Sequence, residues 1–270
     1  MKGRVIELFQ RIAARRFLQP LWRAVYKTAL FGLNVSGGAD VHASGEFRVL
    51  RELARNRRTG GGAMVFDVGA NVGTYAKAVL EVFGDKTTIH CFEPSEHTFG
   101  LLRQALGGDP RVVLHRYGLG DREETVRLHY DTPASGLATL YRESLAHHDT
   151  HLDTSEAIEL KTLDGVCSTH TIDYIDLLKM DVEGHEFKVL LGARTMLERR
   201  AIGAIQFEMG PGSISARTYL RDFYELLSPH YDLFRIVKDG LAPLQRYSEE
   251  HEHFLVTNYL AIRRDYTDIL

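Results

Sequence analysis

Cysteine is scarce in this sequence, and its scarcity excludes two kinds of architecture. The two cysteines, Cys91 and Cys167, are far apart and form no C-x-x-C pair, so neither a disulfide framework nor a cysteine-based zinc site is expected. Free thiols fit a reducing compartment, and we expect a cytoplasmic protein. Long apolar runs are also lacking: no stretch approaches the roughly 18 apolar residues of a spanning helix, and charge interrupts residues 1–17 too often for a signal peptide.

A strong excess of one charge is lacking as well. The net charge of −3 argues against a surface built for nucleic acid. The distribution is uneven, however, because residues 1–58 carry 12 Lys and Arg against 4 Asp and Glu. Apolar residues recur there at helical spacing, at Val5, Leu8, Phe9 and Ile12. We therefore predict a basic helical segment over residues 1–62, which packs on the main domain, contacts a membrane surface peripherally, or serves as a homo-oligomer contact or a lid.

Residues 63–270 alternate strand-like and helix-like patterns, which is typical of a parallel sheet with helices on both faces. Predicted strands cover 63–68, 87–93, 111–120, 174–182 and 201–209, with a further edge strand or hairpin at 124–131. Predicted helices cover 73–83, 95–106 (with Ser95 as N-cap), 185–200 and 215–228. Residues 132–160 have no clean period and predict a long loop or cover. Two strands without a helix between them, 231–239 and 254–264, predict an antiparallel pair at the end.

The first strand runs into a glycine turn, in the stretch VFDVGANVGTYAKAV. Gly69 and Gly73 let the backbone turn tightly and approach a ligand, and the following helix offers free N–H groups. The third glycine of the dinucleotide fingerprint G-x-G-x-x-G is missing, and so is a phosphate-cradling P-loop. Asp67, just before the turn, would repel a pyrophosphate and suits a ligand with a positive centre.

Glu93 ends the second strand, 20 residues after Gly73. In doubly wound sheets an acid at this place binds a ribose hydroxyl pair. S-adenosylmethionine fits both requirements, because it has a sulfonium, an amino-acid end and a ribose but no phosphate. A tight turn without a ligand is the structural alternative.

At this point the sequence resembles the class I S-adenosylmethionine-dependent methyltransferases, and more closely the FkbM-type O-methyltransferases. The resemblance rests on FDVGANVGTYA, CFEPSEHTFGLLRQAL, KTLDGV, IDLLKMDVEGHEFKVLLGA and AIQFEMG, spread over about residues 64–210. It implies a doubly wound, Rossmann-like α/β fold whose seven-stranded, mostly parallel sheet has an antiparallel last strand, and methyl transfer to a hydroxyl of a sugar or natural product. On this basis we predict a methyltransferase domain over 63–270. Its predicted cofactor site comprises Asp67, Gly69, Ala70, Asn71, Gly73, Thr74, Tyr75, Glu93, Pro94, Gly118, Leu119 and Asp181.

The stretch LLKMDVEGHE ends a buried strand in a run of ionisable residues, beside the glycine-turn strand. Methyl transfer depends on alignment of donor and acceptor, and a hydroxyl acceptor also needs its proton removed. We predict that Asp181 faces the methyl donor and that His185 is the base; the structural alternative for His185 is a helix-start residue bonded to a carboxylate. A further hypothesis places Mg²⁺ on Asp181 and Glu208, at the ends of neighbouring strands.

The long loop supplies the predicted acceptor cover at 133–143, with Tyr141 and Arg142. The histidines of HHDTH at 147–151 sit in no metal framework and are read as a solvated loop. A nicotinamide-dependent oxidoreductase and a non-catalytic module are the competing functions. The missing G-x-G-x-x-G fingerprint argues against the oxidoreductase, and the intact glycine turn argues against the non-catalytic module. DVEG stands where N-methyltransferases commonly carry an Asn or Asp with Pro-Pro-Tyr, which favours oxygen as the acceptor atom. The acceptor itself, a small molecule or a glycan, is left open.

Overall fold

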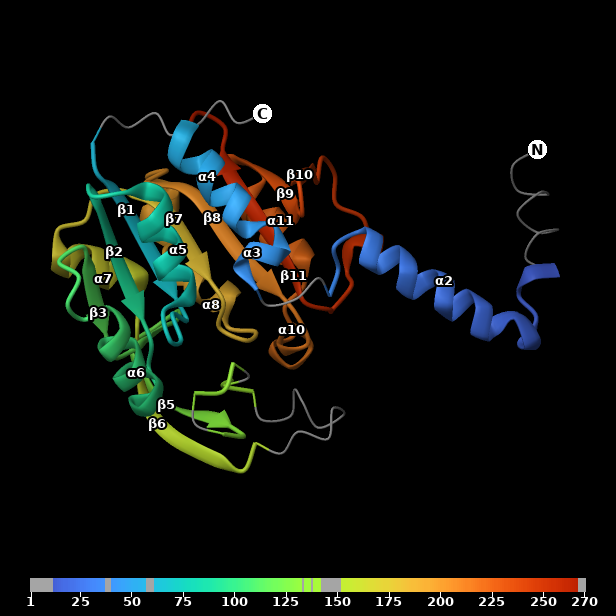
Figure 1. Ribbon diagram of the computed structural model, residues 1–270, viewed down its shortest axis with the longest axis horizontal. Helices are drawn as coiled ribbons and strands as arrows, with labels where there is room; N and C mark the ends of the chain where they lie inside the picture. Colours follow the sequence, from blue (N-terminus) through green and yellow to red (C-terminus); the bar gives the residue numbers. More distant parts are fainter. Residues whose placement is uncertain are drawn as a thin grey trace.

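The computed structural model describes residues 12–36, 40–56, 61–132, 134–136, 138–141 and 152–266. Its main sheet has the order β10-β9-β11-β8-β7-β1-β2-β3 (Figure 1). The strands are β1 (Ala63–Val68), β2 (Thr87–Phe92), β3 (Val112–His115), β7 (Ile175–Met180), β8 (Ile202–Met209), β9 (Tyr231–Val237), β10 (Gly240–Pro243) and β11 (Thr257–Arg263). The series β3-β2-β1-β7-β8 is parallel, and β11 runs antiparallel between β8 and β9. The predicted doubly wound sheet with an antiparallel last strand is confirmed.

The strand β10 corrects the expected strand number, because the described residues give the main sheet eight strands instead of seven. β10 pairs with β9 antiparallel, from Gly240 opposite Val237 to Pro243 opposite Phe234. Four residues are too few to show a hydrophobic period in the sequence. The backbone pairing with β9 is what defines this strand. The connection between β10 and β11 also contains a single turn of 3₁₀ helix, η3 (Glu249–His251).

Helices cover both faces of the main sheet, because successive strand residues point to opposite sides. On one face, α4 (Glu46–Asn56), α5 (Thr74–Phe83) and α6 (Glu96–Leu106) pack on residues such as Val65 and Ile89. On the other, α7 (Leu163–His170), α8 (Glu186–Leu191), α9 (Arg194–Glu198) and α11 (Leu220–Leu227) pack on residues such as Phe66 and Phe92. The strands between them are buried on both faces, as parallel strands usually are.

A second, three-stranded sheet of order β4-β6-β5 lies beyond the ends to which the parallel strands point (Figure 1). It consists of β4 (Gly118–Leu119), β5 (Glu124–Tyr130) and β6 (Thr154–Lys161). The prediction of a loop over 132–160 was therefore wrong for its last part, and the predicted strand 111–120 is divided between two sheets. Ile158 and Leu160 of β6 are buried against Leu128 of β5. Only these two apolar residues alternate with polar ones in this stretch, so the pattern is too short to predict a strand.

Two predicted helices are divided in the structure. The predicted helix 185–200 forms α8 and α9, separated at Gly192, whose Cα lies so close to the carbonyl of Gly120 that a side chain would overlap it. The predicted helix 215–228 begins only at Leu220, after a separate short helix α10 (Gly212–Ala216). Ser95 does occupy the N-cap position of α6, but its side chain makes no capping hydrogen bond in the described structure.

The N-terminal segment contains η1 (Arg16–Leu18), α2 (Gln19–Gly32), α3 (Val41–Ser44) and α4. α4 buries Val49, Leu50 and Leu53 in the same cluster as α5, whereas α2 extends away from the rest of the molecule (Figure 1). A domain boundary near residue 62 stays a prediction. Within the described ranges, no helix combines the length and apolarity needed to cross a bilayer.

Candidate active site

The glycine turn after β1 is held between the ends of β2 and β7. Gly69, Asn71 and Gly73 have positive φ angles of 82°, 47° and 86°, a conformation that glycine adopts without the strain of other residues. The amide N–H of Gly69 donates to the carbonyl of Phe92. A Cβ on Gly69 would overlap the carbonyl oxygen of Asp181. The turn therefore brings the backbone of β1 against the end of β7, and only glycine permits that approach.

Glu93 is tied to this turn by hydrogen bonds. Its Oε2 accepts from the amide N–H of Asn71 at 3.1 Å, and its Oε1 accepts from the amide N–H of Ser95 at 3.0 Å. The side chain is 7% exposed. Burial raises the pKa of Glu93 to about 7, although the two backbone amides pull it down. The carboxyl group is thus fixed in orientation and keeps lone pairs for a ligand.

A first cavity lies between the two sheets. Val68 and Phe92 line it from the main sheet, and Leu128, Ile158 and Leu160 line it from the small sheet. Glu93 is on its wall, together with Pro94, Gly118 and Leu119. An apolar slot between two sheets with one fixed carboxylate could hold a flat heterocycle and a ribose.

A second cavity adjoins the first, and the two share Gly69, Asn71, Gly136, Asp181 and Glu183. Its lining carries more charged side chains and comes from α4, α5, β7, β8 and a residue of β11, through Glu46, Tyr75, Lys179, Glu208 and Asn258. A ligand in the first cavity can therefore reach a second molecule in the second cavity past the end of β7.

Lys179 is a buried cation at the floor of the second cavity. Its Nζ lies 3.4 Å from Oδ1 of Asp67 and 3.3 Å from Oδ2 of Asp181, and 5.0 Å from the ring centroid of Tyr75. Burial disfavours the ammonium form, but Asp181 and Asp67 outweigh it and raise the pKa of Lys179. Lys179 thus stays protonated and is unsuited to act as a base; it holds the two carboxylates in place.

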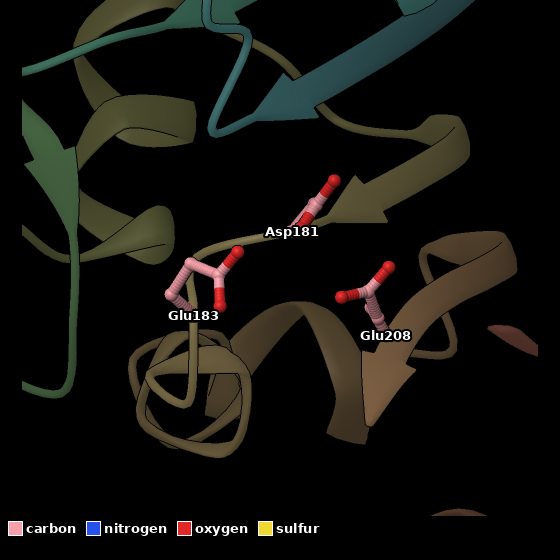
Figure 2. A group of neighbouring side chains, drawn as sticks. All are labelled: Asp181, Glu183 and Glu208. Carbon is pink, nitrogen blue, oxygen red and sulfur yellow. The ribbon is translucent and has the colours of Figure 1, made fainter. Parts of the chain in front are cut away.

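Three carboxylates form an acid cluster opposite Lys179: Asp181 after β7, Glu183 on the following turn, and Glu208 on β8 (Figure 2). Each offers one oxygen atom, and these oxygens lie within 4.8 Å of one another. Burial, then the charge of Asp181, raises the pKa of Glu183 to about 8. Burial, then Asp181 and Glu183, raises the pKa of Glu208 well above its usual value. The cluster is a concentration of negative charge that a cation or protons would relieve.

The turn that carries Glu183 is fixed by the next acid along the chain. Glu186 is 3% exposed, and its Oε1 accepts from the amide N–H of Val182 at 2.7 Å, while its Oε2 accepts from the amide N–H of Gly184 at 3.0 Å. Glu183 itself has a φ of 52°, which is strained for a residue with a side chain. Glu186 therefore supports the turn, and Glu183 points into the site.

His185 lies on the wall of the first cavity and, in the described part of the chain, not of the second. Its Nδ1 is hydrogen-bonded to the hydroxyl of Tyr141 at 3.0 Å. Burial lowers the pKa of His185 to about 4, so the imidazole is neutral at pH 7 and weakly basic. The Tyr141 contact links His185 to the segment 138–141, which covers the cavity.

Most predicted site residues line the two cavities. Gly69, Asn71 and Asp181 line both; Glu93, Pro94, Gly118, Leu119 and His185 line the first; Ala70, Thr74, Tyr75 and Glu208 line the second. Of the described predicted residues, Asp67, Gly73 and Tyr141 line neither cavity. Asp67 is completely buried against Lys179, which offers it no direct path to a ligand. Arg142 and the HHDTH stretch lie outside the described residues.

Sequence reasoning missed three charged residues of the site: Glu46, Lys179 and Glu183. Lys179, Asp181 and Glu183 alternate along LKMDVEG, and a period of two could have placed them on one side of the strand end. Glu46 carried no such signal, because it lies in the N-terminal segment, far from β7 in the sequence. It lines the second cavity and accepts hydrogen bonds from Gln206 at 2.6 Å and Ser44 at 2.5 Å.

Comparisons with known proteins agree with this geometry. Residues 67–232 match the family model described as the methyltransferase FkbM domain. The chain is 27% identical over 148 residues to the 2-O-methyltransferase NoeI of Sinorhizobium fredii, and 29% identical over 139 residues to the hexuronic acid methyltransferase AglP of Haloferax volcanii. Each match covers 50% of this chain, and 59% and 52% of the respective relative. The chain thus spans little more than half the length of these relatives.

Solved structures give more distant likenesses. The methyltransferase FkbM of Methylobacillus flagellatus matches with a TM-score of 0.45 and 18% identity, over 74% of this chain and 43% of that chain. The O-methyltransferase of Bacillus cereus, in complex with SAH, matches with a TM-score of 0.45 and 9% identity, over 96% and 97% of the two chains.

Proposed function

Because this chain belongs to the FkbM methyltransferase family, we propose that it transfers the methyl group of S-adenosylmethionine to a hydroxyl of a sugar or glycoconjugate. The observation that carries this proposal is the pair of adjoining cavities. One has an apolar slot and the fixed carboxylate of Glu93, and the other is lined by the acid cluster together with Glu46 and Lys179. The two meet at Asp181, where a methyl group would pass between them.

The methyl donor suits the first cavity. Its adenine would lie in the apolar slot between Phe92 and Leu160, and its ribose hydroxyls would donate to Glu93, which accepts from Asn71 and Ser95 on its other lone pairs. The sulfonium and the amino-acid end would extend past Gly69 toward Asp181. This order follows the rule that ligands of open α/β sheets bind outside the carboxyl ends of the strands.

The acceptor suits the second cavity. Hydroxyl-rich molecules need many hydrogen-bond partners, and Glu46, Tyr75, Glu208 and Asn258 supply them from four different elements. Two relatives are named for 2-O-methylation and for a hexuronic acid, which supports a sugar as the acceptor class. Lys179 lies on the same wall and adds a positive charge.

The reaction is a single displacement. The acceptor oxygen attacks the methyl carbon from the side opposite to sulfur, the carbon–sulfur bond breaks with its electron pair on sulfur, and S-adenosylhomocysteine leaves. Alignment of the two molecules supplies much of the rate. The hydroxyl proton goes to a carboxylate of the acid cluster, and we propose Glu183, because it lines both cavities. Burial raises the pKa of Glu183 to about 8, so its deprotonated form is a stronger base than an ordinary carboxylate.

Mg²⁺ gives a second form of the same proposal. Hard oxygen ligands suit this ion, and the three converging carboxylates Asp181, Glu183 and Glu208 fit it in chemistry and in charge. When bound, Mg²⁺ would acidify an acceptor hydroxyl. Activity that survives exhaustive chelation would exclude this form, whereas activity lost on chelation and restored by Mg²⁺ would support it.

Replacing each candidate base tests the proton transfer. Without added metal, Glu183→Gln should lower turnover about 10²-fold or more while S-adenosylmethionine affinity changes only a few-fold. His185→Gln should cost less than about tenfold, because the imidazole faces the first cavity and is weakly basic. Single-turnover methylation measures the rate of methyl transfer in each of the two variants. A large loss in His185→Gln with little loss in Glu183→Gln would assign the base to His185.

Calorimetric titration tests the cofactor. The protein should bind S-adenosylmethionine and S-adenosylhomocysteine with micromolar affinity. It should not bind NAD, because the G-x-G-x-x-G turn that holds its pyrophosphate is missing and Asp67 precedes the glycine turn. Methyl transfer from labelled donor to a panel of free and lipid-linked sugars then tests the acceptor. If neither adenosyl ligand bound, the proposal of a methyltransferase would be wrong.

A further inference from the structure

Helix α2 projects from the rest of the protein, and most of its residues are exposed to solvent (Figure 1). It carries large apolar side chains. Leu21 is 53% exposed, Val25 49% and Tyr26 58%; Phe17 before the helix and Phe31 near its end are 78% and 67% exposed. In a water-soluble protein, such a series of exposed apolar side chains marks an interaction surface.

The side chains of α2 are sorted around its axis. Leu21 and Val25 are four residues apart and lie on one side of the helix, with Trp22 and Tyr26 next to them. Arg23 and Lys27 are also four residues apart and lie on the opposite side. The helix therefore has an apolar side bordered by two aromatic residues and a cationic side, on which Phe31 follows Lys27 by four residues. Apart from Phe31, this is the pattern of helices that lie in a membrane interface.

The charge around α2 has only one sign. Residues 8–39 contain five Arg and Lys and no Asp or Glu. Helices that mediate protein–protein contacts usually carry both signs on the exposed side, because paired charges fix register and orientation. A purely cationic side is complementary to a surface of phosphate groups.

The base of α2 is fastened to the body of the protein. The side-chain Nδ2 of Asn34 donates to the carbonyls of Ser44 and Ile236, at 2.9 and 3.1 Å, and the amide N–H of Ser36 donates to the carbonyl of Val256 at 2.8 Å. The helix is thus held out from the body by defined contacts, and whatever binds α2 also orients the enzyme.

We propose that α2 docks the protein on a membrane surface that contains anionic lipids. The apolar side enters the region between headgroups and acyl chains, and Arg23 and Lys27 remain at the level of the lipid phosphates. Tyr26 suits this depth, since it combines an apolar ring with a polar group. Trp22 lies beside it, partly buried, with its indole N–H donating to the carbonyl of Ala13 at 2.8 Å.

A second copy of this chain is the less suitable occupant on grounds of area. The 14 residues of α2 form a helix about 21 Å long and about 10 Å wide. One side of it offers on the order of 300 Å² per copy, below the roughly 600–800 Å² per partner of a stable interface. Two such cationic helices would also repel each other.

The full-length protein tests the proposal with vesicles of phosphatidylcholine alone and of phosphatidylcholine mixed with phosphatidylglycerol. We expect co-sedimentation with the mixed vesicles, weakened by salt. Trp22 is the only tryptophan of the chain, so its fluorescence reports α2 directly and should shift to the blue on binding.

Variants on the two sides of α2 separate the contributions. Leu21→Glu/Val25→Glu should lower vesicle affinity by tenfold or more, and Arg23→Gln/Lys27→Gln by about tenfold. These side chains face solvent, so folding is not at risk. Arg199→Gln/Arg221→Gln removes two exposed cations from the body and is the matched control, with unchanged vesicle affinity.

Three outcomes would overturn the proposal: no binding to mixed vesicles, binding that the α2 variants leave unchanged, or a dimer in sedimentation velocity that Leu21→Glu/Val25→Glu dissociates. The last would assign α2 to a second copy. S-adenosylmethionine affinity should be the same in every variant, so that failure of membrane docking is distinguished from failure of the proposed methyl transfer.

Discussion

At the scale of single residues, the carboxyl group of Glu93 shows how the surroundings fix the orientation and the pKa of a side chain. It is buried, it accepts two backbone hydrogen bonds, and its pKa is raised to about 7 by burial. A carboxylate accepts hydrogen bonds from ribose hydroxyls more strongly than a neutral acid does. Protonation should therefore weaken cofactor binding close to physiological pH.

Glu93→Gln should lower S-adenosylmethionine affinity about tenfold or more, since hydrogen bonds to charged groups contribute roughly 1.5–3 kcal/mol. In the unmodified protein, affinity should fall as pH decreases through about 7, because the raised pKa leaves the acid protonated below that value. Titrations between pH 6 and 8 measure both effects. Glu96→Gln, an exposed acid on α6, is the control. An affinity that is independent of pH in this range would contradict the assigned role.

Sequence patterns found Glu93 but not Lys179 or Glu46. Glu93 stands at the end of the second strand, 20 residues after Gly73. Its position can therefore be read from a short stretch of the sequence. Lys179 matters because Asp67 lies beside it on the neighbouring strand β1, and Glu46 matters because its carboxylate accepts from Gln206, 160 positions away in the sequence. Pairings of this kind are set by sheet order.

At the scale of elements, the glycine turn joins the ends of β1 and β7. Gly69 has a φ of 82°, and a side chain there would overlap the Asp181 carbonyl. Gly69 and Asp181 both line the two cavities. The turn is therefore a structural requirement of the place where the cavities meet.

Gly69→Ala should destabilise the protein by about 2 kcal/mol or more, from the backbone strain and the forced separation of β1 and β7. Thermal unfolding and S-adenosylmethionine titration measure the effect. The unfolding temperature and the affinity for S-adenosylmethionine should both decrease. Gly108→Ala is the matched control, because a Cβ there has no atom within 4 Å. Unchanged stability and affinity in Gly69→Ala would show that the turn can relax.

At the scale of the whole molecule, the small sheet covers the first cavity. Leu128, Ile158 and Leu160 face Phe92 of the main sheet across the first cavity, and Thr139 of the cover pairs with His129 of β5. A ligand in that cavity contacts both sheets and should hold them together.

S-adenosylhomocysteine should therefore slow amide hydrogen exchange in β5 and β6 and at 138–141, by roughly the factor 1 + [L]/Kd where exchange needs the ligand to leave. Exchange in α11 and β9, far from the cavity in the sheet order, is the internal reference. Protection restricted to the glycine turn would mean that the small sheet does not take part in binding.

The sequence by itself determined the strand–turn–helix series, the glycine turn, the acid after β2 and the antiparallel last strand, because these depend on short-range periodicity and backbone conformation. Only the tertiary structure decided that Asp181, Glu183 and Glu208 converge, that Lys179 of β7 pairs with Asp67 of β1, that β6 returns to line the first cavity, and that α2 extends away from the rest of the molecule. These features join residues far apart in the chain, and their positions follow from strand order and packing rather than from any local pattern.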